Sequence, residues 1–190
     1  MQQVYLIRHA TPAIQPTVPT VEWRLSDRGI DEARRLARIA ESWGLQAIYS
    51  SIEPKAEATA LLIAESQLMP VHVTEGFDEL RFDQWIGNAD EFSEAVRDIL
   101  ANPEVSMRGA ERADSAATRF ASGIEIVRAG PFPAAIVSHG RIITSYLAQA
   151  LALEDAFATW RSIPMPGWCA LDVEGDRPRL LSPFEGLPPV

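Results

Sequence analysis

Two stretches of the chain share one hydrophobic pattern, an apolar run that stops at a histidine. Residues 4–7 are apolar and are followed by Arg8 and His9, and residues 134–138, apolar except for the last, are followed by His139. An unbroken run of branched and aromatic residues is typical of a strand buried on both faces. Ligands bind at the carboxyl ends of such strands in open α/β sheets, so the pattern predicts a site where both strands end.

Elsewhere, segments with helical spacing alternate with short apolar runs. Ser26 is the expected N-cap of a helix that ends by Gly44, and further helices are expected over residues 54–66, 89–101, 114–129 and 140–151. The expected strands beyond the first cover residues 47–50, 71–74, 134–138, 167–174 and 177–182, with a loose tail from Pro183. This alternation predicts an α/β fold, a mostly parallel central sheet between two helical layers.

Length and composition limit the class of protein. The 190 residues fit one domain spanning residues 1–190, in which a helical, cap-like segment around residues 88–130 is expected to roof the pocket. A single cysteine, no basic leader and no apolar stretch near the roughly 18 residues that span a bilayer predict a soluble cytoplasmic protein without membrane contact. The net charge of -9 disfavours nucleic acid as a partner, but a local basic pocket still suits a small anion.

The two strand-end histidines are compatible with several kinds of chemistry. Metal binding needs three or four convergent ligands, and His72 is the only other histidine in the chain. No ligand-like spacing such as His-Glu-x-x-His occurs either, so we expect neither a metal nor a cofactor. A structural histidine at each strand end remains the alternative to a functional one.

Nucleophilic attack on phosphorus fits the neighbouring residues better. The guanidinium of Arg8 is a planar fork of donors suited to a phosphoryl group, and the helix expected to start at Gly140 would offer backbone N–H groups. Ser51 and Lys55, just past another strand end, are candidates for further donors. Glu79 is the candidate proton donor to the leaving oxygen, provided that burial raises its pKa.

Five motifs in this order resemble those of the histidine phosphatase superfamily, the phosphoglycerate mutase-like proteins. They are Leu-Ile-Arg-His-Ala at residues 6–10, Leu-Ser-Asp-Arg-Gly at 25–29, Ser-Ser-Ile-Glu-Pro-Lys-Ala at 50–56, the segment 79–87 with its tryptophan and closing glycine, and Val-Ser-His-Gly at 137–140. The likeness runs from residue 4 to about residue 182, and it implies a phosphoglycerate mutase-like fold.

The resemblance also implies a role for each matched residue. His9 would accept the phosphoryl group, while Arg8, Lys55 and His139 would hold the phosphate oxygens. Glu79 would donate a proton to the leaving group and later activate water. The family needs no metal for this chemistry.

Several positions depart from the family pattern. Lys55 stands where the family usually has arginine. A lysine ammonium lacks the bidentate fork of a guanidinium. Gln15 stands where many members have an asparagine that touches phosphate. For both Gln15 and Ser51, a turn or capping role is the alternative to a phosphate contact. Asp83 replaces a glycine, and its charge would oppose a phosphodianion at the mouth, while Ile86 replaces an acidic residue.

We therefore predict a metal-independent phosphatase that hydrolyses a small phosphomonoester through a phosphohistidine on His9. Phosphoglycerate mutase-type phosphoryl transfer is one alternative, and a non-catalytic regulatory module that binds a phosphoryl ligand is another. The expected partner is a small phosphorylated metabolite, and a homodimer stays open as the assembly state. The sequence does not identify the substrate.

Overall fold

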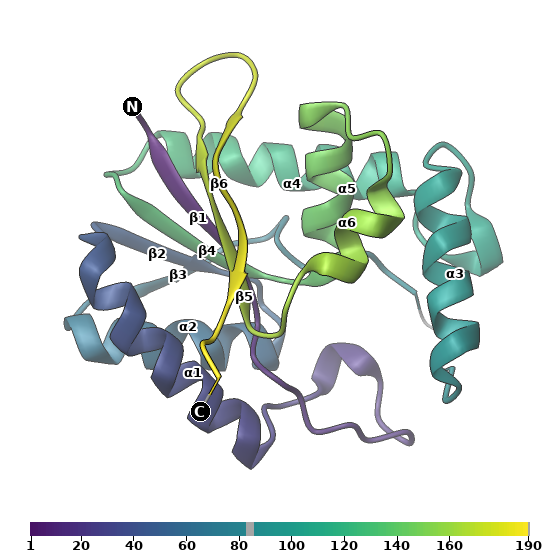
Figure 1. Ribbon diagram of the computed structural model, residues 1–190, viewed down its shortest axis with the longest axis horizontal. Coiled ribbons are helices and arrows are strands. Elements are labelled where there is room, and N and C mark those ends of the chain that lie inside the picture. The colour runs from purple at the N-terminus through teal and green to yellow at the C-terminus, as the bar shows by residue number, and fades with distance from the viewer. Residues whose placement is uncertain (83–85, 190) are drawn as a thin grey trace.

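The computed structural model describes residues 1–82 and 86–189, and its centre is a six-stranded sheet (Figure 1). The strand order is β3-β2-β4-β1-β5-β6. The first four strands in this order are mutually parallel, whereas β5 runs antiparallel to β1 and β6 antiparallel to β5. The bounds are β1 Gln3–Arg8, β2 Ala47–Ser50, β3 Val71–Val73, β4 Ala134–Ser138, β5 Gly167–Asp172 and β6 Arg179–Gly186. The predicted mostly parallel sheet is confirmed.

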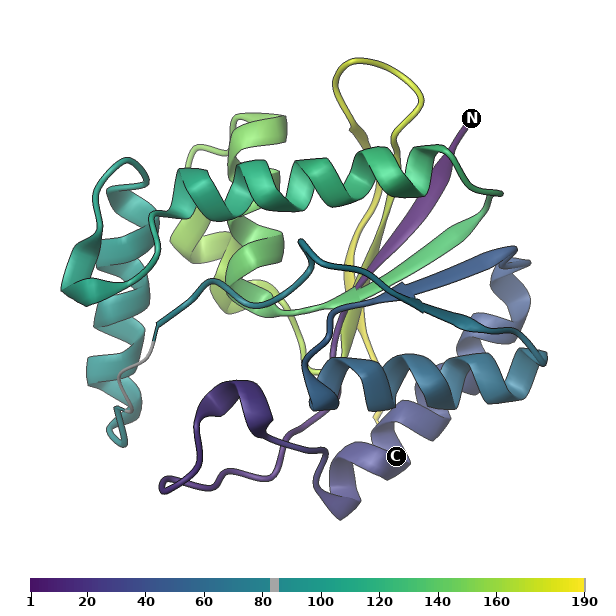
Figure 2. The same cartoon turned by 180° about the vertical axis from the view of Figure 1, so that it is seen from behind.

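Helices cover both faces of this sheet (Figures 1 and 2). Their bounds are α1 Asp27–Ala40, α2 Pro54–Gln67, α3 Ala89–Ala101, α4 Ala113–Arg128, α5 Gly140–Leu151 and α6 Ala156–Ser162. The pair α1 and α2 packs on one face, and α4 and α5 pack on the other. Within the segment 88–130, α4 belongs to the layer on the sheet, while α3 lies outside it and contacts α6 (Figure 2).

The residues of β1 show why its apolar run is unbroken. Val4 and Leu6 are fully buried in the core beneath α4 and α5, and Ile7 is fully buried in the core beneath α1 and α2. Successive side chains of a strand point to opposite faces, so a strand covered on both faces needs apolar residues at every position.

The pairing of β1 with β4 brings the two predicted histidines to one edge. Arg8 is the register partner of Ser138, and the backbone N–H of His9 donates to the Ser138 carbonyl at 3.0 Å. Because the strands are parallel neighbours, the residues that follow them leave the sheet side by side. His9 and His139 are thereby held together by backbone geometry.

The start of α1 is docked onto the loop that follows β1. The Ser26 hydroxyl accepts from the Gly29 N–H and donates to the Thr11 carbonyl, both at 3.0 Å. A Cβ on Gly29 would lie 2.0 Å from the Thr11 oxygen, so only glycine allows this approach. The predicted N-cap is confirmed, and the glycine of the second motif has a steric reason.

Two elements differ from the sequence prediction. The helix α6 was not expected, because its seven residues are too few to establish a helical period. The last strand extends to Gly186, past Pro183, where a loose tail was predicted. Since β6 is an edge strand, a proline is tolerated there without loss of a ladder hydrogen bond.

Within residues 1–82 and 86–189, no helix has the length and apolar character required to cross a membrane.

Candidate active site

A cavity of about 430 Å³ opens at the carboxyl ends of β1 and β4, and we call it the histidine cleft. Its charged and titratable lining comes from Arg8, His9, Lys55, Glu79 and Arg141. Much of the remaining wall is apolar or aromatic, contributed by Pro12, Ile14, Trp23, Phe82, Ile86, Ala89, Phe92, Trp160 and Met165. The cleft therefore combines a charged floor with walls that exclude water.

The imidazole of His9 lies in the floor of this cleft and is 5% exposed. Its Nδ1 is 2.7 Å from the Ala10 carbonyl oxygen, which can only accept a hydrogen bond. The ring proton therefore sits on Nδ1, and Nε2 carries a free lone pair. Burial, aided by the charges of Lys55 and Arg8, lowers the pKa of His9 to about 3. The ring is neutral at pH 7, as a nitrogen nucleophile requires.

The second histidine lies behind the first. The ring centres of His9 and His139 are 5.0 Å apart at an interplanar angle of 63°. His139 is fully buried and is not part of the cleft lining. Burial above all, then the charges nearby, lowers its pKa well below the usual range, so this ring is neutral too.

A hydrogen-bond chain fixes the tautomer of His139. The Ser51 hydroxyl donates its single hydrogen to Asp78 Oδ1 at 3.1 Å, and Ser51 Oγ is also 2.9 Å from His139 Nε2. Ser51 must therefore accept from His139, which places the ring proton on Nε2. The other nitrogen, Nδ1, is buried and has no hydrogen-bond partner among the described residues.

The guanidinium of Arg8 is held between β1 and the segment after α6. One nitrogen, Nη1, donates to the Ile163 carbonyl at 2.8 Å, while Nε is buried without a hydrogen-bond partner in the described chain. A Cβ on Gly140 would lie 3.1 Å from this Nε and 3.3 Å from Trp160 Nε1. Gly140 thus gives Arg8 the room to reach the cleft, and the unpartnered Nε is a donor free for an anion.

Lys55 is buried and already paired. Its ammonium donates to the Thr20 carbonyl at 2.8 Å and to the carboxylate of Glu53 in a short contact. An ammonium has three donors, so one remains for a ligand. Glu53 was not predicted as a site residue, although an acidic residue where the family motif has leucine was a signal in the sequence.

Glu79 lies at the N-terminus of α5, in contact with its backbone. Its carboxylate accepts from the N–H groups of Leu80 at 2.9 Å and Ile142 at 3.0 Å, and it pairs with Arg141 Nε at 3.3 Å. Burial alone would raise the pKa of Glu79, but Arg141 and these amides outweigh it, and the pKa is lowered. The predicted condition for the acid role, a raised pKa, is therefore not met.

Four of the predicted phosphate ligands do not line the histidine cleft, His139 among them as described above. Gln15 is exposed and is not part of the cleft lining. Ser51 is fully buried and bonded to His139 and Asp78, away from the lining. At the start of α5 that follows Gly140, the amides of Arg141 and Ile142 already serve Glu79, so the expected anion site holds the protein's own carboxylate.

Asp83, expected at the mouth, lies outside the described residues, as do Gln84 and Trp85. In the part of the chain that the structure describes, no group of three or more histidine, cysteine, aspartate or glutamate side chains is placed to hold a metal ion.

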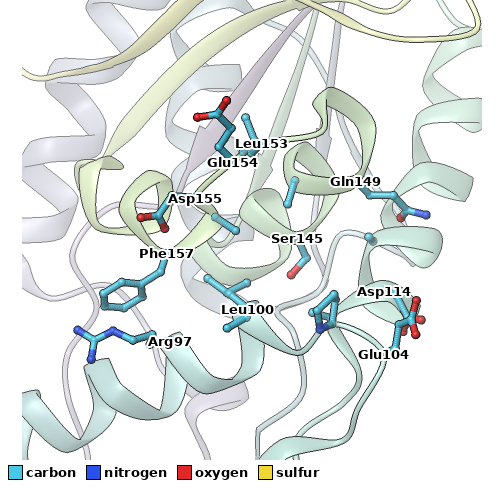
Figure 3. Close-up of a pocket in the computed structure, with 16 residues that line it drawn as sticks. Arg97, Leu100, Glu104, Asp114, Ser145, Gln149, Leu153, Glu154, Asp155 and Phe157 are labelled. Carbon is cyan, nitrogen blue, oxygen red and sulfur yellow. The ribbon is translucent and has the colours of Figure 1, made fainter.

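A second cavity, of about 580 Å³, lies between α3, α4, α5 and α6 (Figure 3). Figure 3 shows Arg97 on α3 close to Phe157, with the guanidinium carbon 4.5 Å from the ring centre. No histidine lines this cavity, and its acidic side chains are Glu104, Asp114, Glu154 and Asp155. It is larger than the histidine cleft, but its lining holds no histidine and no buried cation.

Comparisons with known proteins show the family of this chain. A family model described as "Histidine phosphatase superfamily (branch 1)" matches residues 4–185. No curated protein matches the sequence.

Solved structures share the fold at low identity. A mycobacterial glucosyl-3-phosphoglycerate phosphatase is 20% identical with a TM-score of 0.79, covering 96% of this chain and 98% of that one. A phosphoserine phosphatase from Entamoeba histolytica, in complex with 3-phosphoglyceric acid, is 22% identical with a TM-score of 0.74, covering 98% of each chain. YhfR of Bacillus stearothermophilus is 21% identical with a TM-score of 0.73, covering 96% of each chain.

Proposed function

Because the chain belongs to the histidine phosphatase superfamily (branch 1), we propose that it is a metal-independent phosphatase that hydrolyses a small phosphomonoester through a phosphohistidine on His9. The observation that carries this proposal is the protonation of His9. Its Nδ1 proton is held by the Ala10 carbonyl, so the Nε2 lone pair is available in a ring that lines the cleft.

In the first step, His9 Nε2 attacks phosphorus and the bond to the ester oxygen breaks. Arg8, through its unpartnered Nε, and Lys55, through its remaining donor, bind phosphate oxygens. A donor role for His139 requires the ring proton on Nδ1, with Ser51 then donating to Nε2 instead of to Asp78. Glu79 gives a proton to the leaving oxygen. The approach of a phosphodianion raises the pKa of a neighbouring carboxylate, which favours the protonated form that this step needs.

In the second step, water attacks the phosphoryl group and the N–P bond breaks. Glu79, now ionised, takes the proton from this water. Its lowered pKa suits this base role directly. Inorganic phosphate leaves, and His9 returns to its neutral form.

The experiment compares p-nitrophenyl phosphate hydrolysis by the wild type, His9→Ala and His72→Ala. His72 is an exposed strand histidine that does not line the cleft, so it is the matched control. We expect His9→Ala to lose at least about 1,000-fold in kcat and His72→Ala to stay within about twofold. Equal rates for the wild type and His9→Ala would contradict the proposal.

Two alternatives were left open by the sequence, and the same assay tests the second of them. Mutase-type transfer needs a second phosphate position, but among the described cleft residues Lys55 already pairs with Glu53 and Arg141 with Glu79. Hydrolysis is therefore preferred. A non-catalytic module that binds a phosphoryl ligand is favoured by one observation, the carboxylate of Glu53 only 3.6 Å from His139 Nε2. Phosphate binding without turnover would support the module.

A further inference from the structure

Glu53 is a buried carboxylate beside the Lys55 ammonium of the histidine cleft, with contacts on both oxygens. It precedes α2 as the N-cap residue, but its side chain makes no capping hydrogen bond and is instead 4% exposed. Oε2 contacts the Lys55 ammonium, and Oε1 accepts from the Glu79 N–H at 2.7 Å. This geometry gives Glu53 one counter-ion, the same cation that phosphate would use.

The side-chain charges around the cleft sum to little net positive charge for binding a dianion. Among the described residues, the cations that line it are Arg8, Lys55 and Arg141, and the carboxylates in contact with them are Glu53 and Glu79. With both histidines neutral, three positive and two negative charges leave one net positive charge. A phosphomonoester carries close to two negative charges at pH 7, so binding it would leave an uncompensated charge in a buried site.

We propose that Glu53 takes up one proton from solvent when the cleft binds a doubly charged phosphoryl group, so that binding weakens as the pH rises. The inference rests on the proposed function in one respect, that an oxyanion occupies the cleft beside His9. Lys55 is then free of an anionic partner and can pair with the bound anion, and the protonated carboxyl no longer repels that anion. Glu53 acts through Lys55 and is a positioning residue.

The groups that face Glu53 favour it as the proton acceptor. They are Lys55 from its own helix, Glu79 from the loop after β3 and His139 from the end of β4, with Asp78 behind Ser51. Burial raises the pKa of Glu53, and the negative charge of Glu79 adds to this, against the opposing effect of Lys55. The pKa values of His9 and His139 are instead lowered. The shifts run in opposite directions, which favours the carboxylate over the histidines as the site of proton uptake.

Sulfate is the probe, because it remains a dianion from pH 6 to 8.5 and contributes no proton of its own. Calorimetric titration of the whole protein at pH 7, in two buffers with different ionisation enthalpies, counts the protons taken up. We expect roughly one proton per sulfate, and a sulfate Kd that rises by up to about tenfold for each pH unit. A Kd independent of pH with no proton uptake would overturn the proposal.

Variants assign the proton to its residue. Glu53→Gln is expected to abolish the uptake and to bind sulfate on the order of tenfold more tightly than the wild type at pH 8. Glu57→Gln, a half-buried glutamate on the same helix, should behave as the wild type. Undiminished uptake in Glu53→Gln would assign the proton to Glu79 or to a histidine and overturn the proposal. If Glu53→Gln fails to fold, Glu53→Asp must retain the uptake, and its loss there would also be contradictory.

This test is independent of turnover. Sulfate binding with one proton but no hydrolysis of p-nitrophenyl phosphate would contradict the proposed function and leave the role of Glu53 intact. Hydrolysis combined with sulfate binding that takes up no proton would contradict the role of Glu53 and leave the proposed function intact.

Discussion

Two carboxylates, Glu53 and Glu79, flank the histidine cleft and have opposite protonation tendencies. Both are largely removed from water, with 4% and 15% of the side chain exposed. Burial raises the pKa of Glu53, whereas the pKa of Glu79 is lowered despite burial. The difference lies in their partners, since Glu79 pairs with Arg141 and accepts from three backbone amides, whereas Glu53 pairs with Lys55 and accepts from one.

The comparison shows that burial alone does not decide which carboxylate carries a proton. Hydrogen bonds from backbone N–H groups stabilise the ionised form, and those at a helix N-terminus add the helix dipole. Glu79 accepts such hydrogen bonds at α5, whereas Glu53 is the N-cap residue of α2 but its side chain makes no capping hydrogen bond. The proposed mechanism uses this difference, with Glu79 as the acid and base at the reacting atoms and Glu53 as a proton acceptor beside the phosphate.

Among the substitutions that test this comparison, Glu79→Gln should have the largest effect on activity. The amide keeps an acceptor for the α5 backbone but cannot shuttle a proton, so we expect kcat to fall on the order of 100- to 1,000-fold. Loss of the buried partner of Arg141 should also cost about 3 kcal/mol of unfolding free energy. Steady-state kinetics and denaturant unfolding measure the two effects.

Asp98→Asn is the control for Glu79→Gln, because Asp98 pairs with Arg108 on the surface away from the cleft. Its kcat should be unchanged. A Glu79→Gln enzyme with wild-type kcat would assign the proton transfer to another group.

The buried histidines predict a loss of stability in acid. In the unfolded chain a histidine takes up its proton near pH 6.5, whereas folded His9 stays neutral to about 3. Stability is therefore present above pH 6.5 and is lost as the pH falls toward 3, at about 1.4 kcal/mol per pH unit for each such histidine. Urea unfolding between pH 7 and 4.5 measures the slope.

His9→Asn should reduce this acid slope, since one of the two buried imidazoles is gone. The control is His72→Asn, which removes the exposed histidine and should leave the slope unchanged. An identical slope in His9→Asn and the wild type would show that His9 is charged or solvated in the folded protein.

A smaller effect is expected from the cation that Glu53 holds. Lys55→Arg restores a bidentate fork and should improve the affinity for inorganic phosphate by about threefold. The gain should be larger in a Glu53→Gln background, because the carboxylate no longer competes for the guanidinium. A double-mutant cycle measures this coupling, and we expect about 0.5–1 kcal/mol. Additive effects would mean that Glu53 does not compete with phosphate for residue 55.

The smallest effect is expected in the second cavity. Glu154→Gln removes a charge from its lining without touching the histidine cleft. Activity on p-nitrophenyl phosphate should change by less than about twofold, as for most surface substitutions. A tenfold loss would show that the larger cavity takes part in the reaction.

The sequence predicted those parts of the site that follow from local pattern. Arg8, His9 and His139 each end a strand whose apolar run is visible in the sequence, and parallel pairing of those strands fixes their proximity. Ser26 and Gly29 form a local cap that the sequence also predicts. In these cases the sequence signal, an apolar run or a capping pattern, lies within a few residues of the side chain.

Other features depend on contacts between distant segments. The carboxylate of Glu79 meets the amide of Ile142, and no local pattern indicates that this pairing lowers the pKa of the glutamate. Ser51 was placed among the phosphate ligands because it follows a strand, but its hydroxyl is used by Asp78. Glu53 was not predicted, because Lys55, two residues later, was the residue of this motif whose charge suited phosphate binding.

The phosphohistidine on His9 is the central claim, and rapid quenching with ³²P-labelled substrate tests it most directly. Protein stopped in alkali within the first turnover should carry a label that is stable to base and labile to acid. Peptide mapping should place that label on His9, and His9→Ala should carry none. Steady turnover without labelled protein, or a label on another residue, would contradict the account.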